Sequence, residues 1–196
     1  MLSPYLFAVF IDSLVDKVKS TGVGCYLSYF CLSIFLYADD ILLIAPSVTA
    51  LQILLTACED ELEYLDMRIN ANKSVCIRFG PRYDSDCNCL TLSQGGALLW
   101  TKHCRYLGVN FVSARVFKCS FDNSKCKYFK AVNAIFSKVG RFASEEVVLN
   151  LLRVKCLPVL LYCVEACPVL ARDKHSFEFT AVNRGYLGHG GYLGQK

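Results

Sequence analysis

A pair of adjacent carboxylates, Asp39 and Asp40, lies between two apolar β-type runs and constrains this chain more than any other stretch. The runs span residues 31–37 and 41–45, and apolar residues occupy both parities of each. This pattern predicts strands buried on both faces. The gap between the runs leaves room only for a tight turn, so they are predicted to form a hairpin. Two acids at the tip of a buried hairpin need a positive partner, and Mg²⁺ suits carboxylate oxygens. The alternative is an Asp-Asp pair that caps a solvated hairpin.

Charge is divided unevenly along the 196 residues. Residues 1–100 contain 6 basic and 11 acidic side chains, whereas residues 101–196 contain 15 basic and 6 acidic ones. This asymmetry indicates an acidic half and a half suited to a polyanion. A hydrophobic content of 54% and an aromatic content of 13% argue against a disordered chain.

The twelve cysteines include no Cys-x-x-Cys pair, and several lie on apolar stripes, where Cys acts as a small hydrophobic residue. No signal peptide is evident, so we expect reduced thiols in an intracellular protein. A zinc site from Cys87, Cys89, His103 and Cys104 is an alternative, but its spacing fits no common site. The apolar stretch 151–170 contains charged residues and a proline, which argues against a membrane span.

Helical periodicity predicts two helices in the first half of the chain. The first has Ser3 as its N-cap and Pro4 at its first helical position, and it ends near Lys19. The second begins at Ser47 and ends near Met67, with its acidic residues facing water.

Further elements follow in order. A polar bend is predicted at 69–73, and a strand at 74–79. A short hairpin joins 90–92 to 98–100, and another strand covers 104–111.

The basic half is predicted to be helical. One amphipathic helix begins near Asn123, and a second opens at Ser144 with acids in its first turn. Pro158 is expected to kink or end that second helix. Residues 171–196 are expected to be a disordered tail.

Four motifs occur in one order along this chain. They are Leu2-Ser3-Pro4, Tyr37-Ala38-Asp39-Asp40, Asn70-Ala71-Asn72-Lys73 and Tyr106-Leu107-Gly108-Val109. This order resembles the reverse transcriptase domain of non-LTR (LINE-type) retrotransposons, from the end of motif B into the thumb. The resemblance covers about residues 2–170.

The resemblance implies an α+β fold. A partial right-hand polymerase palm, an antiparallel sheet with covering helices, would span residues 1–112. A helical thumb-like region would span 113–170.

The resemblance also implies roles for residues of the hairpin. Asp39 and Asp40 would be catalytic and would hold two Mg²⁺ ions, with Asp39 the direct ligand and Asp40 a supporting one. Tyr37 and Ala38 would lie near the primer terminus. Lys73 would approach the triphosphate and could protonate pyrophosphate; the alternative is an ordinary surface lysine.

Two further regions would contact nucleic acid. Tyr106, Leu107 and Gly108 would form the primer grip, although a glycine there also fits an ordinary bent strand. Basic residues would bind phosphates without reading sequence, or would simply solubilise a helix face. These residues are Lys125, Lys127, Lys130, Lys138 and Arg141.

The family's motif A and fingers are not recognisable upstream of Tyr37, so we expect an N-terminally truncated domain with little polymerase activity of its own. In the complete protein, the partners would be an RNA template, a DNA primer and deoxynucleoside triphosphates. One alternative is an inactive remnant that acts at most as a non-specific nucleic-acid-binding module. Another is a decayed element without molecular function. An in-frame motif A upstream of the first codon would instead indicate an active enzyme.

Overall fold

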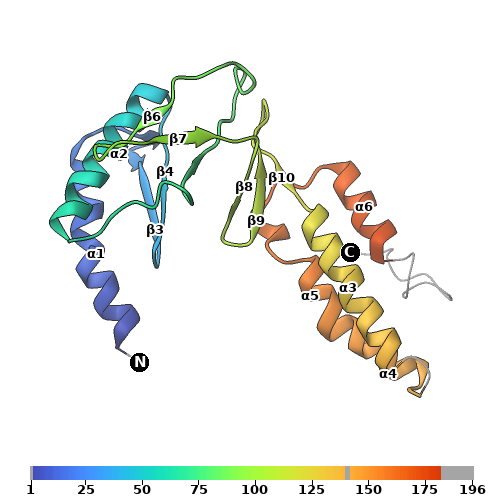
Figure 1. Cartoon of the computed structure of the whole chain (residues 1–196). Helices are drawn as coiled ribbons and strands as arrows, with labels where there is room; N and C mark the ends of the chain where they lie inside the picture. The colour runs from blue at the N-terminus through green and yellow to red at the C-terminus, as the bar shows by residue number, and fades with distance from the viewer. Residues whose placement is uncertain (1, 140–141, 182–196) are drawn as a thin grey trace. The chain divides into compact units, whose positions relative to one another are not determined.

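The structure is a computed structural model that describes residues 2–139 and 142–181 (Figure 1). Its contacts divide the chain into two compact units, which are treated separately below. Unit 1 comprises residues 1–78 and 84–101, and unit 2 comprises residues 79–83 and 102–196. Helices and small sheets occur in both units, in agreement with the predicted α+β class. The units divide near residue 101, and Val109 and Phe111 pack against the core of unit 2.

Two helices that pack against each other frame unit 1 (Figure 1). Helix α1 spans Ser3–Ser20, and helix α2 spans Val48–Tyr64. The N-cap of α2 is Ser47, whose Oγ accepts a backbone hydrogen bond at 3.1 Å. Helix α1 differs from the prediction, because Leu2 rather than Ser3 occupies its N-cap position. Leu2 already has helical φ and ψ, so the helix begins one residue earlier.

Four short strands follow α1 as two antiparallel hairpins. They are β1 (Cys25–Leu27), β2 (Phe30–Leu32), β3 (Ile34–Tyr37) and β4 (Asp40–Leu43). The run predicted at 31–37 therefore belongs to two strands. Ser33 separates them, and its carbonyl accepts a hydrogen bond from the Ile44 N–H at 2.9 Å.

The β3–β4 hairpin is buried on one face only. Ile34 and Leu36 face the core that also contains Leu14 and Leu54 of the two helices, whereas Phe35 and Tyr37 are exposed. The prediction that both faces are buried is therefore wrong. A two-stranded sheet covered by helices on one side leaves its other side to solvent.

Three more strands complete unit 1: β5 (Val75–Cys76), β6 (Leu90–Thr91) and β7 (Ala97–Trp100). β6 and β7 pair antiparallel, which confirms the predicted hairpin, while β5 pairs parallel to β7. The strand predicted at 74–79 is only two residues long. In the described residues, the strands form four small sheets rather than one antiparallel palm sheet.

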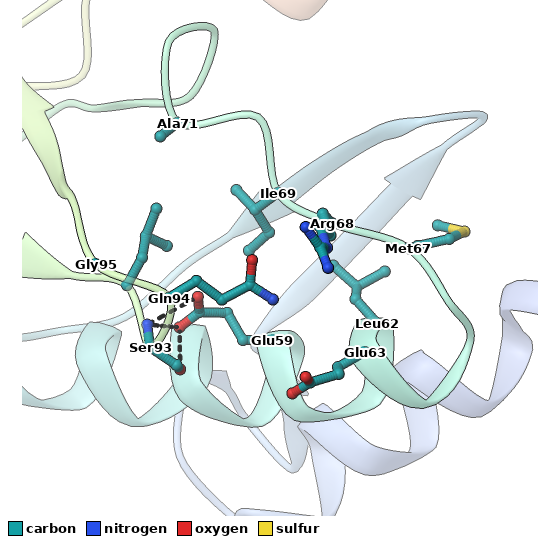
Figure 2. Close-up of a pocket in the computed structure, with 11 residues that line it drawn as sticks. Glu59, Leu62, Glu63, Met67, Arg68, Ile69, Ala71, Ser93, Gln94 and Gly95 are labelled. Atoms are coloured by element: carbon teal, nitrogen blue, oxygen red, sulfur yellow. Dashed lines mark hydrogen bonds between the residues drawn. The ribbon is translucent and has the colours of Figure 1, made fainter.

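Two side chains of α2 hold the edge strand β6 and the turn after it. The Gln52 side chain donates to the Thr91 carbonyl and accepts from the Thr91 N–H, both at 2.9 Å. About two helical turns further along α2, the Glu59 carboxylate accepts from the N–H and Oγ of Ser93, at 3.1 and 3.0 Å (Figure 2). Glu59 therefore has a structural partner, unlike the purely solvated acidic face that the sequence predicts. Glu63 and Arg68 line the hollow beside this contact.

Unit 2 begins with the antiparallel sheet β10-β9-β8. Its strands are β8 (His103–Tyr106), β9 (Val109–Val112) and β10 (Cys119–Ser120). The single strand predicted at 104–111 is therefore a tight hairpin. Both inner residues of the connection, Leu107 and Gly108, adopt positive φ, and this reverses the chain.

Helices make up the rest of unit 2. They are α3 (Asp122–Val139), α4 (Glu145–Leu151), a π-helical turn η1 (Leu152–Cys156), α5 (Leu157–Leu160), a 3₁₀ turn η2 (Val164–Ala166) and α6 (Ala171–Ala181). α3 packs against α4, η1 and α5 (Figure 1). Tyr128 and Val132 of α3 meet Leu152, Cys156 and Leu160 in one core.

The predicted irregularity at Pro158 takes the form of the π-helical turn. Proline lacks an N–H, so it cannot donate to the carbonyl four residues before it. Just before it, the Leu157 N–H bonds to the Leu152 carbonyl, five residues back. By length and mean hydropathy (1.9), Glu145–Ala166 alone among the described segments reaches the range of a membrane-crossing helix. A core helix of a soluble protein can have the same length and hydropathy.

The prediction of a disordered tail from residue 171 is wrong for its first eleven residues, because they form α6. Phe177 of this helix is buried, and its ring meets that of Phe121 edge to face, with centroids 4.9 Å apart. This aromatic contact gives the segment a partner that its own polar composition does not reveal. Residues 182–196 lie outside the described residues.

Candidate active site and nucleic-acid surface

The tip of the β3–β4 hairpin carries both acidic residues that the sequence singles out. Tyr37 and Asp40 form the last cross-strand pair, so Ala38 and Asp39 make a two-residue connection. Asp39 and Asp40 are exposed, and within the described residues neither carboxylate has a hydrogen bond or ion pair. The hairpin therefore presents two available carboxylates to solvent.

Ala38 holds the connection in a strained conformation. Its φ is 53°, in the left-handed region that costs a residue with a Cβ about 1–2 kcal/mol. A two-residue hairpin with positive φ at its first inner position usually has glycine there. Strained residues of this kind persist where the surrounding structure determines them, and they gather at functional sites.

The donor chemistry of this tip fits Mg²⁺, which commonly takes one or two carboxylates and completes its shell with water and substrate phosphates. Within residues 2–139 and 142–181, no group of three His, Cys, Asp or Glu side chains is arranged to hold a metal. The residues that fit a cation at this tip are thus Asp39 and Asp40 together with oxygen atoms of a ligand.

Lys73 lies at the end of the predicted polar bend. The Asn70 side chain accepts hydrogen bonds from the N–H groups of Asn72 and Lys73, at 3.1 and 3.2 Å. The Asn70 carbonyl also accepts from Ser74 at 2.9 Å. These bonds fix the backbone of the bend, while the Lys73 side chain is exposed.

The Tyr106-Leu107-Gly108 motif forms the turn between β8 and β9. Leu107 has φ of 47° and Gly108 has φ of 83°, and the flanking pair is Tyr106 with Val109. Positive φ at both inner residues matches a type I′ turn, for which Asn-Gly is the favoured pair. The hydroxyl of Tyr162 donates to the Leu107 carbonyl at 3.3 Å.

Tyr162 also lies directly over Gly108. A Cβ at residue 108 would stand 2.9 Å from Cε1 of the Tyr162 ring, so the ring occupies the space that only glycine leaves. A glycine inside a predicted strand indicates a bend or a close approach of another group. Here the chain turns at Gly108, and the group that approaches it is the Tyr162 ring of the same chain. No local pattern pointed to Tyr162, which lies 55 residues further along.

The predicted nucleic-acid-binding lysines divide into two groups on α3. Lys127, Lys130 and Lys138 are exposed, and at 3.6 residues per turn they fall within about 80° of arc on one face. Lys125 is half-buried on another side, 3.9 Å from an Asp122 carboxylate oxygen and 5.7 Å from the centre of the Phe177 ring. Its charge is partly engaged within the protein. Arg141 lies outside the described residues.

The buried cysteines are unreactive by their surroundings. Burial raises the pKa of the Cys58 thiol to about 12 and that of Cys76 to about 11. Burial likewise raises the pKa of Cys119 to about 12, with a smaller effect of its hydrogen bond with Cys167. These thiols stay protonated at neutral pH, in agreement with their prediction as small hydrophobic residues.

Comparisons with known proteins agree with the geometry. Residues 1–111 match the family described as reverse transcriptase (RNA-dependent DNA polymerase). A relative, the retrovirus-related Pol polyprotein from type-2 retrotransposable element R2DM of Drosophila melanogaster, is 28% identical over 128 residues. The match covers 61% of this chain and 12% of that polyprotein, so the chain spans a small part of its relative. No solved structure matches.

The family match covers more than half of the chain, and the relative is a retrotransposable-element protein, as the motif order Tyr-Ala-Asp-Asp, Asn-x-x-Lys and Tyr-Leu-Gly predicts. The chain therefore belongs to the reverse transcriptase family, as a reverse transcriptase domain of the LINE type.

Proposed function

We propose that this chain supplies the hairpin tip of the nucleotidyl-transfer site of an RNA-directed DNA polymerase. Unit 1 would be part of the palm, and the helices of unit 2 would be thumb-like. The substrates would be an RNA template, a DNA primer and deoxynucleoside triphosphates. The observation that carries the proposal is the pair of exposed, unpartnered carboxylates on the strained β3–β4 tip.

Each residue of the tip has a proposed role. Asp39 would be the direct cation ligand and Asp40 a supporting one, with two Mg²⁺ ions in the complete enzyme. Divalent cations supply activation of the primer 3′ hydroxyl and charge neutralisation at the leaving pyrophosphate. Tyr37 and Ala38 would lie against the primer terminus. Lys73, on its fixed bend, would hold the triphosphate and could donate a proton from Nζ to pyrophosphate.

A binding experiment tests the metal part without needing turnover. Tb³⁺ replaces hard oxygen-bound cations, and a tyrosine close to it sensitises its emission. Tyr37 stands opposite Asp40, so Tb³⁺ held at the tip should show tyrosine-sensitised emission. We expect Asp39→Asn to weaken Tb³⁺ binding by about tenfold, equivalent to about 1.4 kcal/mol. Asp60→Asn, an equal charge change on the exposed face of α2, should leave binding unchanged.

Adding a deoxynucleoside triphosphate should strengthen cation binding at the tip, because its phosphates complete the coordination shell. Equal Tb³⁺ binding by the Asp39→Asn and Asp60→Asn variants would contradict the metal role of the tip. Primer extension on an RNA template by the wild-type chain, lost on Asp39→Asn, would support polymerase activity in this chain itself.

A second candidate is a non-specific nucleic-acid-binding module without catalysis, and the exposed face of Lys127, Lys130 and Lys138 favours it. Binding of an RNA–DNA hybrid would then survive Asp39→Asn. Replacing Lys127 and Lys130 with Glu should weaken binding by about tenfold or more and reduce the salt slope by about 2. The matched control is Lys17→Glu with Lys19→Glu, an equal charge change on α1. Equal weakening by both pairs would indicate net charge alone.

A further inference from the structure

We infer that Tyr162 is a positioning residue that holds the Leu107–Gly108 turn in the shape presented to the primer strand. The inference rests on the proposed function, in which Tyr106, Leu107 and Gly108 form the primer grip. It adds a residue from the helical region that the motif itself does not contain.

The turn by itself lacks the sequence for its conformation. A two-residue connection with positive φ at both inner positions favours Asn or Asp followed by glycine. Here Leu107, with φ of 47°, occupies the first position. A leucine side chain cannot form the local hydrogen bonds that let Asn adopt left-handed φ. The conformation therefore needs support from elsewhere in the fold.

Tyr162 provides that support through two contacts. Its hydroxyl donates to the carbonyl of Leu107, at 3.3 Å, and so fixes the orientation of the peptide group inside the turn. Its ring lies over Gly108, where Cε1 is 2.9 Å from the position of an added Cβ. One side chain thus contacts both inner residues of the turn.

The backbone around Tyr162 is adapted to this contact. The next residue, Cys163, is also left-handed, with φ of 57°, and it ends the helical run before η2. Leu107 and Tyr162 remain 38% and 55% exposed, so the braced turn is accessible to a nucleic acid. The contact between Tyr162 and the β8–β9 turn therefore involves two left-handed non-glycine residues of unit 2. Leu107 accepts the tyrosine's hydrogen bond, and Cys163 directly follows the tyrosine.

Two substitutions with matched controls test the contact. Tyr162→Phe removes the hydroxyl, and its control is Tyr26→Phe, which removes a similar bond from a 59%-exposed tyrosine to the Gly22 carbonyl. Gly108→Ala places a methyl group against the ring, and its control is Gly95→Ala. Gly95 also has φ of 83° but has no atom within 4 Å of an added Cβ.

The first measurement is amide hydrogen exchange at the β8–β9 hairpin of the full chain. We expect Tyr162→Phe to speed exchange there about three- to tenfold, as the loss of one hydrogen bond implies. Gly108→Ala should do the same, whereas both controls should leave this hairpin unchanged. Leu107→Asn should restore protection in the Tyr162→Phe background, because Asn-Gly favours the turn without the brace. Unchanged exchange in Tyr162→Phe would overturn the inference.

The second measurement asks where the primer lies. A DNA primer with a photoreactive 4-thiothymidine at its 3′ end is annealed to RNA, bound to the chain and irradiated. We expect crosslinks in the peptide that contains Leu107 and Gly108. These should fall about three- to tenfold in Tyr162→Phe, while total bound hybrid stays within about twofold. Thermal unfolding of each variant shows that it is folded.

The outcomes distinguish the positioning role of Tyr162 from the primer-grip role of the turn. Crosslinks at the turn that persist in Tyr162→Phe overturn the positioning role alone. Bound hybrid without crosslinks at the turn in the wild-type chain overturns the primer grip, and with it the functional part of the inference. Crosslinks that fall in Tyr162→Phe but not in Tyr26→Phe support it.

Discussion

Unit 1 and unit 2 differ in charge and in how they hold their exposed turns. Unit 1 carries 5 Lys or Arg and 11 Asp or Glu, while unit 2 carries 16 and 6. The β3–β4 tip of unit 1 leaves its side chains free, whereas the β8–β9 turn of unit 2 is braced by Tyr162. The difference fits two tasks. A free carboxylate pair can take a cation, and a braced turn can hold a polymer in one position.

The cores differ as well. Unit 1 has two clusters, one between α1, α2 and the β3–β4 hairpin and one under β6 and β7. In the described part of unit 2, a single cluster joins α3 to the helices that follow it. The acidic tip of unit 1 therefore stands on a helix-backed hairpin, and the basic face of unit 2 lies on the outer side of a core helix.

The largest expected effect compares these cores. Leu54 and Leu152 are fully buried, one in each unit, and Leu→Ala at either should cost about 2–5 kcal/mol of unfolding free energy. Urea denaturation measures the loss, and hydrogen exchange locates it. We expect Leu54→Ala to expose amides of unit 1 first and Leu152→Ala those of unit 2. Identical hydrogen-exchange patterns for the two variants would contradict the conclusion that each unit has its own core.

Alkaline pH should weaken the protein through its buried thiols. The pKa of Cys58 is raised to about 12 in the folded state, so the unfolded thiol ionises first as the pH rises. The contribution of the buried, protonated Cys58 thiol to the free energy of unfolding is fully present below about pH 9. It is lost as the pH rises from about 9 to about 12. Each pH unit in that window should remove about 1.4 kcal/mol per such thiol.

Unfolding free energy measured against pH tests this prediction. Cys58→Ala should flatten the decline, while Cys126→Ala, at an exposed position of unit 2, should not. An unchanged slope in Cys58→Ala would mean that other groups cause the alkaline loss.

The N-cap residues of the two units also differ, and we expect an effect of about 1 kcal/mol on the free energy of unfolding. Ser47 caps α2 of unit 1 through its Oγ, whereas Ser144 occupies the N-cap of α4 in unit 2 without a side-chain hydrogen bond. Ser47→Ala should therefore cost about 1 kcal/mol and Ser144→Ala close to nothing. Chemical denaturation of the two variants measures the difference. Equal costs would mean that Ser144 caps α4 in solution.

The smallest expected effect concerns strain at the acidic tip. Ala38→Gly relieves a left-handed alanine but adds backbone freedom to the unfolded chain, so the net change should lie within about 0.5 kcal/mol of zero. Ala50→Gly, inside α2, should cost about 0.5–1 kcal/mol. Thermal unfolding compares them. An equally large loss from both would show that Ala38 is unstrained.

Much of the local structure could be predicted because its causes are local. The spacing of apolar residues fixed the extents of α2 and α3 to within a few residues, and Ser47 marked the start of α2. The bend at Asn70 follows from an Asx side chain that bonds to its own backbone. Asp39 and Asp40 were predicted at a hairpin tip for a local reason as well, since runs that end at Tyr37 and resume at Ile41 leave room only for a tight turn.

Other predictions failed where a distant residue decides. Lys125 reads as one more exposed lysine, yet it is half-buried, and its Nζ lies 5.7 Å from the centre of the Phe177 ring of α6. Residues 171–181 are predicted to be part of a disordered tail, yet they form α6, whose Phe177 ring packs edge to face against the Phe121 ring. The run at 74–79 reads as a full strand, yet only Val75 and Cys76 pair with β7, in parallel, and Phe79 forms an isolated bridge with Ala114.

The sequence alone therefore determined the family, the helices α1 to α4, the β3–β4 and β6–β7 hairpins, and the carboxylate pair at one tip, because short-range spacing and turn chemistry encode them. Tertiary structure alone decided which face of the β3–β4 hairpin is buried and which lysines are free. It also decided that Tyr162 braces the Leu107–Gly108 turn. These outcomes depend on contacts between residues tens of positions apart, and such contacts form only when packing closes the intervening chain.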